Sequence, residues 1–304
     1  MKTPKYQQVD QFTQRKGKIV KKSLSHWKGR PLFSVIEISP VAACNRRCTF
    51  CPVSEDYYKK HGLRGVMKKS LYEKLIGDLA SIEYAGMILF SGECEPLLHK
   101  RLADWIGTTK QRLPNVTIEV NTNGDLLNLD ELNSLFASGL DTISISMYDG
   151  PHQVDHFESL RKNAMLSKKQ ILLRRRYEVD GDYGMVMSNR GGLINNDDYT
   201  STSEEEVDFP IKKNCYYPFY YLVADGSGNV TMCSHDWGKK YVCGNFSETH
   251  IFDIWVNGRL KEARKKLSNC DRSLPSCDRC NAMGDLIGAE SFYAWQSISN
   301  ASKI

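Results

Sequence analysis

The sequence predicts an α/β protein whose parallel β-sheet closes into a complete or partial barrel. Short apolar runs alternate with segments of helical periodicity between about residues 33 and 148, the pattern of parallel strands joined by crossover helices. The alternation stops near residue 190, and two apolar runs around a glycine-containing turn then predict a hairpin in a smaller second unit. In folds of this class the chemistry lies on loops at the carboxyl ends of strands.

Each element of the first part has its own indication in the sequence. Strands are expected at 33–39, 85–92, 115–124 and 140–148, and helices at 67–82, 97–113 and 128–139. Ser70 is the expected N-cap of the first of these helices, and Gly139 closes the last as a C-cap. The strands end at SPVAACNRRC, SGECEP, NTNG and SMYDG, so these four loops are expected to share one edge of the sheet.

The second part begins after a change in composition. Residues 191–212 are rich in glycine, asparagine, serine and acidic residues and predict an acidic linker. A hairpin at 220–235 follows, then helices at 250–267 and near the C-terminus. We therefore expect a basic N-terminal arm at 1–33, a first domain at 34–190, the linker at 191–212 and a second domain at 213–304.

The bulk composition excludes several classes of protein. No run of eighteen apolar residues is present, so no membrane span is expected. The basic N-terminal segment has no hydrophobic core of a signal peptide, so we expect an exposed arm and a cytoplasmic protein. The net charge of +5 is spread along the chain, whereas nucleic-acid-binding proteins concentrate basic residues on one face. Binding to nucleic acid is therefore not indicated.

Ten cysteines are too many to ignore in a reducing compartment, where grouped thiols more often bind metal than form bridges. Cys44, Cys48 and Cys51 have the spacing C-x3-C-x2-C directly after a predicted strand. Three thiolates can hold three irons of a cubane iron–sulfur cluster and leave the fourth iron open. The alternatives are three unrelated loop cysteines, or part of a zinc site that is completed from elsewhere.

A second set of cysteines lies in the C-terminal part, and its members are Cys215, Cys233, Cys277 and Cys280. Four thiolates can close a cluster, and a zinc ribbon is the rival interpretation because ligand number and spacing do not separate zinc from iron. Three cysteines remain. Cys243 is expected to be a buried strand residue, Cys270 is an alternative ligand or inert, and Cys94 is discussed below.

The segment CNRRCTFC resembles the signature of the radical S-adenosylmethionine superfamily, with the aromatic Phe50 before the last cysteine. The resemblance implies that the open iron binds S-adenosylmethionine and that its cleavage yields a 5′-deoxyadenosyl radical. SGECEP resembles the Gly-Gly-Glu-Pro segment that binds the methionine amine, which gives Glu95 that role, with Glu93 as a competing candidate and Cys94 where glycine is usual. The other implied contacts to S-adenosylmethionine are Asn121, Asn123, Ser146 and Arg174.

The C-terminal part resembles the Twitch domain, a shortened form of the SPASM domain that holds auxiliary clusters in this superfamily. No further cysteine follows Cys280, so one auxiliary cluster is expected. The resemblance therefore implies a partial (β/α)6 parallel barrel followed by a small α+β domain with a β-hairpin and an iron–sulfur cluster. The implied cofactors are two 4Fe–4S clusters and S-adenosylmethionine.

The segment SNRGG, residues 188–192, resembles dehydrogenases of this superfamily that act on aminocyclitols such as 2-deoxy-scyllo-inosamine. This resemblance places Arg190 at the substrate, where a guanidinium can orient a hydroxyl. Two residues after Cys233, where these dehydrogenases carry an acidic residue, the chain has His235, a candidate base. The expected reaction oxidises a secondary alcohol of a small polar sugar or aminocyclitol to a ketone, with flavodoxin or ferredoxin as the reducing partner.

Other functions stay open at this point. A radical epimerase would use a thiol, Cys94 or Cys243, to return a hydrogen atom to the substrate radical. A peptide-modifying enzyme is also possible, although the arm at 1–33 leaves little room for a peptide-recognition domain. A zinc-dependent nucleic-acid-binding protein would need the basic arm and the three arginines at 174–176 to form one surface.

Overall fold

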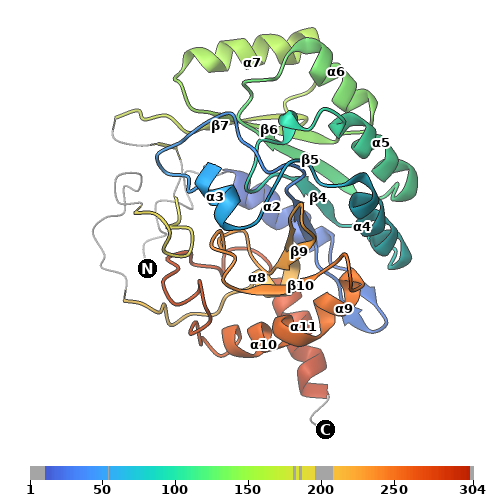
Figure 1. Cartoon of the computed structure of the whole chain (residues 1–304), viewed down its shortest axis with the longest axis vertical. Coiled ribbons are helices and arrows are strands. Elements are labelled where there is room, and N and C mark those ends of the chain that lie inside the picture. The colour runs from blue at the N-terminus through green and yellow to red at the C-terminus, as the bar shows by residue number, and fades with distance from the viewer. Residues whose placement is uncertain (1–10, 54, 181–182, 185–186, 196–207, 302–304) are drawn as a thin grey trace.

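Figure 1 shows the chain as a computed structural model. The structure describes residues 11–301 except 54, 181–182, 185–186 and 196–207. The first ten residues of the predicted arm and most of the predicted acidic linker therefore lie outside the described residues.

One eight-stranded sheet organises the described part of the chain, with the strand order β10-β9-β8-β3-β4-β5-β6-β7. Its strands are β3 (Val35–Ile38), β4 (Met87–Phe90), β5 (Thr117–Thr122), β6 (Thr142–Met147), β7 (Ile171–Arg175), β8 (Tyr221–Ala224), β9 (Asn229–Thr231) and β10 (Val242–Asn245). Neighbours from β8 through β3 to β7 are parallel, and β8, β9 and β10 are antiparallel to one another. The predicted α/β class is confirmed.

The predicted hairpin is present as β8 and β9, and it joins the same sheet as the first part of the chain. Strand β8 pairs in parallel with β3, from Val35 opposite Tyr221 to Ile38 opposite Ala224. The sixth parallel strand therefore comes from the C-terminal part, which places its loops beside the loop that follows β3.

Helices cover the outside of the sheet. They are α4 (Lys69–Ser81), α5 (Leu102–Arg112), α6 (Leu129–Ala137) and α7 (His152–Asn163), which follow one another along the sheet in Figure 1. Ile36 and Phe90 on the outer face pack with Leu75 of α4 and Trp105 of α5 in the main core. Within the described part of the chain, every helix is too short or too polar to cross a lipid bilayer.

The predicted caps have different outcomes. The N-cap of α4 is Lys68, without a side-chain cap hydrogen bond, so the prediction for Ser70 is wrong: the helix begins at Lys69 and takes Ser70 into its first turn. Gly139 directly follows the C-cap Ser138 of α6 and has φ of +101°, the conformation for which glycine is favoured.

The C-terminal part adds helices at the end of the molecule opposite α6 and α7 (Figure 1). They are the short α8 (Tyr217–Tyr220), α9 (Ile251–Val256), α10 (Gly258–Leu267) and α11 (Ala289–Ala301). Two short elements follow the loops after β3 and β4, namely α3 (Glu55–Lys60) and the 3-10 turn η1 (Pro96–Leu98). A two-stranded ribbon of β1 (His26–Trp27) and β2 (Arg30–Pro31) precedes β3.

The described part of the predicted exposed arm instead contains a packed helix, α2 (Gln11–Lys22). Val20 is buried in a cluster with Val35, Met87 and Tyr221 on the inner face of the sheet. Arg15 donates a 2.6 Å hydrogen bond to the buried carboxylate of Glu119. The helix packs here because a curved parallel sheet with apolar inner residues needs a cover that the crossover helices outside cannot supply.

Candidate active site between two cysteine sets

The first cysteine set lies on the loop that leaves the carboxyl end of β3. Cys44, Cys48 and Cys51 are all partly buried, and the backbone N–H of Cys51 donates to the carbonyl of Cys48 at 3.0 Å. Burial raises the pKa of all three thiols, to about 11 for Cys48, and repulsion from neighbouring thiols adds to this effect for Cys44 and Cys48. Three thiols gathered on one tight loop are a donor set that fits an iron–sulfur cluster with one open iron.

Arg46 fixes this loop to the ends of two neighbouring strands. Its guanidinium makes paired hydrogen bonds to Asp125, which follows β5, at 2.7 and 2.5 Å. A second pair reaches Asp149, which follows β6, at 2.7 and 2.6 Å. The planar fork of arginine suits two carboxylates at once. The cysteine loop is thereby held against the edge where the sequence predicted the site.

Glu95 connects the loop after β4 to the end of β5. Its carboxylate accepts hydrogen bonds from Leu97 N at 3.1 Å, Thr122 Oγ1 at 2.6 Å and Asn123 N at 2.8 Å. The Asn123 amide donates onward to Asn45 of the cysteine loop at 2.8 Å. The structure therefore brings Glu95 and Asn123 together beside the first cysteine set, and Glu95 has a local structural role as well.

The other predicted S-adenosylmethionine contacts lie along the same edge. Among the described residues, the Asn121 Oδ1 atom is buried without a hydrogen-bond partner, while its amide donates to Ser91 Oγ at 3.2 Å. Ser146 and Arg174 are register partners on β6 and β7. The Phe50 ring stacks on Tyr148 with centroids 5.8 Å apart. A buried amide oxygen without a partner fits a ligand that carries a donor, such as the amine of S-adenosylmethionine.

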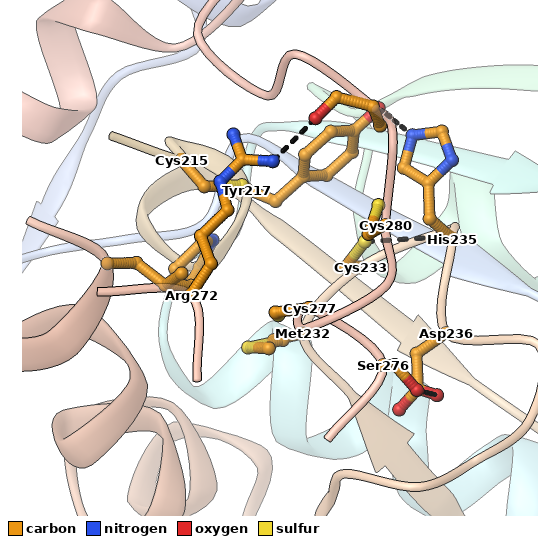
Figure 2. A pocket seen from close by; sticks show the side chains of 13 residues that line it. Cys215, Tyr217, Met232, Cys233, His235, Asp236, Arg272, Ser276, Cys277 and Cys280 are labelled. Atoms are coloured by element: carbon orange, nitrogen blue, oxygen red, sulfur yellow. Dashed lines mark hydrogen bonds between the residues drawn. The ribbon is translucent and has the colours of Figure 1, made fainter. Parts of the chain in front are cut away.

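The second cysteine set lines a cavity of about 440 Å³ (Figure 2). Its members come from three places: Cys215 precedes α8, Cys233 follows β9, and Cys277 and Cys280 lie between α10 and α11. Burial raises the pKa of all four thiols, and repulsion from neighbouring thiols adds to this for Cys215, Cys233 and Cys277. Four thiols around one cavity, three partly buried and Cys280 buried, fit a fully ligated cluster, because metal binding offsets the cost of forming thiolates there.

Arg272 is a buried cation at this cavity that no motif in the sequence marks. Its guanidinium donates to four backbone carbonyls, those of Lys213, Asn214, Ala282 and Met283. Its charge lowers the pKa of Cys215, Cys277 and Cys280 against the larger effect of burial. Arg272 therefore ties together the segments that carry the cysteines, and it favours negative charge on them.

His235 also lines the larger cavity rather than a space beside the first cysteine set (Figure 2). Its Nδ1 lies 2.7 Å from Ser188 Oγ, its Nε2 lies 3.0 Å from Tyr217 Oη, and its backbone N–H donates to Cys233 Sγ at 3.1 Å. Burial lowers the pKa of His235 to about 3. Both ring nitrogens are engaged within the protein.

Arg190 lies between the two cysteine sets. Its guanidinium carbon is 4.8 Å from the centroid of the Trp237 ring, and its charge lowers the pKa of both Cys51 and His235. Among the described residues its buried Nε has no hydrogen-bond partner. Its φ of +50° is uncommon for a residue other than glycine and marks a constrained position.

A smaller cavity of about 230 Å³ adjoins the larger one, because Cys233 and Asp236 line both. Its wall also contains Glu37 of β3, Glu93 of the loop after β4, and Trp237. The smaller cavity thus extends from Glu93, in the loop that resembles the amine-binding motif, to Cys233 of the second cysteine set. The acidic wall was missed by the sequence analysis, although a glutamate inside the apolar run FSVIEIS could have suggested it.

The remaining three cysteines, Cys94, Cys243 and Cys270, belong to neither set. Cys94 Sγ donates to Ser91 O at 3.4 Å, and proximity to Cys44 contributes to raising its pKa. Cys243 lies on β10 with its Sγ 3.6 Å from Tyr241 O, so its predicted strand position is confirmed, but it is partly buried where a buried residue was expected. Cys270 is exposed and contacts Asn214 instead of joining the second cavity.

Two family models match the chain in sequence order. The Radical SAM superfamily matches residues 38–164, and SPASM, an iron–sulfur cluster-binding domain, matches residues 215–281. The S-adenosyl-L-methionine-dependent 2-deoxy-scyllo-inosamine dehydrogenase of Niallia circulans is 32% identical over 251 residues, which cover 82% of this chain and 93% of that protein. The tungsten-containing aldehyde ferredoxin oxidoreductase cofactor-modifying protein of Pyrococcus furiosus is 32% identical over 106 residues, 34% of this chain and 28% of that protein.

Solved structures agree with these matches. BtrN in complex with AdoMet and 2-DOIA superposes with a TM-score of 0.67 and 30% identity, over 83% of this chain and 94% of that one. Native anSMEcpe with bound AdoMet has a TM-score of 0.52 at 14% identity, over 88% of this chain and 99% of that one, and shares the fold.

Proposed function

This chain belongs to the radical S-adenosylmethionine superfamily, and we propose that it oxidises a secondary alcohol of a sugar or aminocyclitol-like substrate to a ketone. Its cofactors are two 4Fe–4S clusters and S-adenosylmethionine. The observation that carries the proposal is the identity of 32% to a dehydrogenase over 93% of that protein's length. The two cavities support the proposal. The larger is lined by the four cysteines of the second set, which suit an auxiliary cluster, and the smaller adjoins it and offers a space for the substrate.

The residues that would hold the cofactors follow from the site. Cys44, Cys48 and Cys51 would bind the first cluster, and the four cysteines of the larger cavity the second. Phe50, Glu95, Asn121, Asn123, Ser146 and Arg174 would bind S-adenosylmethionine. When bound, S-adenosylmethionine and the first cluster supply a 5′-deoxyadenosyl radical for hydrogen abstraction, and the second cluster supplies an electron acceptor.

Oxidation of a carbinol to a ketone removes a hydrogen atom from carbon, a proton from oxygen and one further electron. We propose that the substrate occupies the smaller cavity and that its reacting hydroxyl points out of it toward Arg190, which packs on the lining residue Trp237 and would orient that hydroxyl. Glu93 is suited to accept the hydroxyl proton, because it lines this cavity and burial raises its pKa.

His235, which the sequence suggested as the base, has both ring nitrogens engaged by Ser188 and Tyr217. We propose that it positions the segment carrying Cys233 and takes no proton from the substrate. We assign the role of proton acceptor to Glu93, in the wall of the smaller cavity, instead of His235.

A radical epimerase is the second candidate. Cys94 is a partly buried thiol near Cys44, and burial keeps its pKa high, so it stays protonated as a hydrogen-atom donor must. Cys243 lies on β10 and is less suited. Modification of a peptide ranks below both, because the identity to 2-deoxy-scyllo-inosamine dehydrogenase extends over 93% of that protein's length. Membership of the superfamily, with its iron–sulfur domain, replaces the zinc-dependent nucleic-acid-binding alternative.

The reducing partner and the compartment complete the proposal. We propose flavodoxin or ferredoxin as the donor of the electron that starts the reaction. All ten cysteines are free, as expected in a reducing compartment, and we propose the cytoplasm.

The test is product analysis with anaerobically reconstituted protein, S-adenosylmethionine, a reductant and a panel of aminocyclitols and sugars. A product two mass units lighter than its substrate, which reacts as a ketone, supports the dehydrogenase. A product of unchanged mass with inverted configuration supports the epimerase. Replacing Cys94 with alanine separates the two, because only the epimerase needs that thiol.

A further inference from the structure

We propose that Glu37 is a specificity-determining residue that binds an ammonium group of the substrate in the smaller cavity. The inference rests on the proposed function for the location of the substrate. It adds a chemical requirement, a cationic nitrogen next to the reacting part of the molecule, and a residue that recognises it.

The wall of the smaller cavity is acidic. Glu37, Glu93 and Asp236 line it, and none of its described lining residues is a lysine, arginine or histidine. Each of the three carboxylate residues is at most 6% exposed. Burying carboxylates is costly unless a positive charge or several donors compensate for the lost water.

The three carboxylates are compensated unequally. Lys239 lies 2.7 Å from Glu93, but it also lies 3.0 Å from Asp225, so one cation serves two acids. Asp236 is satisfied by the backbone N–H groups of Lys240 and Tyr241 and by Ser276. Glu37 receives one hydrogen bond, from the Tyr221 hydroxyl, and forms no ion pair with a described residue, although Lys16 Nζ lies 3.4 Å from that hydroxyl. The ionisable side chains that line the cavity are thus all carboxylates, and a bound cation would balance the one that has no direct cationic partner, Glu37.

Glu37 lines the cavity, and one of its two carboxylate oxygens is held by a hydrogen bond. The Tyr221 hydroxyl donates to Glu37 Oε2 at 2.6 Å, and Lys16 lies over the Tyr221 ring at 4.6 Å. The other oxygen, Oε1, accepts no hydrogen bond from any described residue. It lies on the side of Gly92, where an added Cβ would be 3.4 Å away. This oxygen can therefore accept a hydrogen bond from a ligand in the cavity.

An ammonium group suits this position better than a hydroxyl. It brings a full positive charge and three donors, so it can bind Glu37 Oε1 and still reach a neighbouring acceptor such as Thr231 or Ser234 of the same wall. A neutral hydroxyl supplies one donor and leaves the charge unbalanced. We therefore expect a substrate with an amine at one ring position to bind more tightly than the same compound with a hydroxyl at that position.

The test measures binding without turnover. Calorimetry with the reconstituted holoenzyme and S-adenosylmethionine, in the absence of a reductant, compares 2-deoxy-scyllo-inosamine with the cyclitol that has a hydroxyl in place of the amine. Wild type is expected to bind the amine about 30-fold or more tightly than the neutral compound. Glu37→Gln is expected to reduce this preference to about threefold or less, and Glu37→Asp to keep most of it.

Glu119→Gln is the matched control, because Glu119 is a buried carboxylate of the same sheet that Arg15 already neutralises outside the cavity. This variant should keep the full preference for the amine. If Glu37→Gln does not fold, Tyr221→Phe removes the hydrogen bond that aims the carboxylate and should lower the preference.

Three results would overturn the inference. They are wild-type binding of both compounds with equal affinity, no binding of the amine, and an unchanged preference in the Glu37→Gln or Tyr221→Phe variant that folds. Failure of the proposed function looks different: tight, Glu37-dependent binding of the amine without ketone formation would leave this inference standing and remove the dehydrogenase.

Discussion

Lys239 places its Nζ 2.7 Å from the carboxylate of Glu93 and 3.0 Å from that of Asp225. Glu93 belongs to the loop after β4 that adjoins the first cysteine set, and Asp225 to the turn between β8 and β9, the strand that precedes Cys233. All three side chains are at most 8% exposed. This ion pair network therefore fixes the two halves of the site relative to each other.

Lys239→Met should destabilise the protein by about 3 kcal/mol, because it leaves two buried carboxylates without their cation. Thermal or denaturant unfolding of the apoprotein measures this. Lys240→Met is the control, since Lys240 is exposed and should have an effect of about 0.5 kcal/mol or less. Equal stability of the two variants would contradict the role given to Lys239.

The same variant should change the dependence of stability on pH. Burial raises the pKa of Glu93 above its ordinary value of 4.5, and Lys239 opposes that rise. A carboxyl whose pKa is higher in the folded than in the unfolded protein stabilises the fold below pH 4.5. This contribution is lost as the pH rises through the pKa that the group has in the folded state. Without Lys239 the pKa rises further, so the deficit of Lys239→Met should grow from pH 4.5 to pH 7. A deficit independent of pH would contradict this assignment.

Arg46→Gln should release the first cysteine loop from the ends of β5 and β6. The loss of two paired contacts, each partly exposed, should lower stability by about 1 kcal/mol and speed the loss of iron from the first cluster. Iron retention under a chelator measures this, with the second cluster as an internal reference. Arg101→Gln, which removes an exposed pair with Asp104, should leave retention unchanged.

Gly284→Ala should disturb the second cysteine set. An added Cβ at this position would lie 2.6 Å from Cys215 Sγ, and φ is +78°. Gly62→Ala is matched in backbone conformation, with φ of +66° and nothing within 4 Å of its Cβ. Both variants should lose about 1 kcal/mol to backbone strain. Only Gly284→Ala should also lose iron from the second cluster, and equal iron contents would contradict the close approach.

The sequence predicted those parts of the molecule that have a local pattern. The alternation of apolar runs and helical segments is local, and it indicated the parallel sheet and the edge at which the loops gather. The spacing of Cys44, Cys48 and Cys51 is local too, as is the pair Cys277 and Cys280. For this reason the fold class, the superfamily and the cofactors were predicted and are confirmed.

Contacts between distant residues could not be predicted. Lys239 and Glu93 are 146 positions apart, and Arg15 and Glu119 are 104 apart, without a motif that marks either pair. The helix α2 has few apolar residues, so its packing against the sheet depends on a surface formed by other segments. The engagement of His235 by Ser188 and Tyr217 likewise follows from tertiary structure alone.

The most direct measurement follows the hydrogen atom from substrate to cofactor. Reconstituted protein, S-adenosylmethionine and a reductant would be incubated with 2-deoxy-scyllo-inosamine deuterated at its carbinol carbons, and 5′-deoxyadenosine and product would be analysed by mass spectrometry. We predict one deuterium in 5′-deoxyadenosine for each ketone formed, and loss of both in a variant with alanine at Cys44, Cys48 and Cys51. Ketone without deuterium transfer, or transfer with the alcohol retained in the product, would contradict the account.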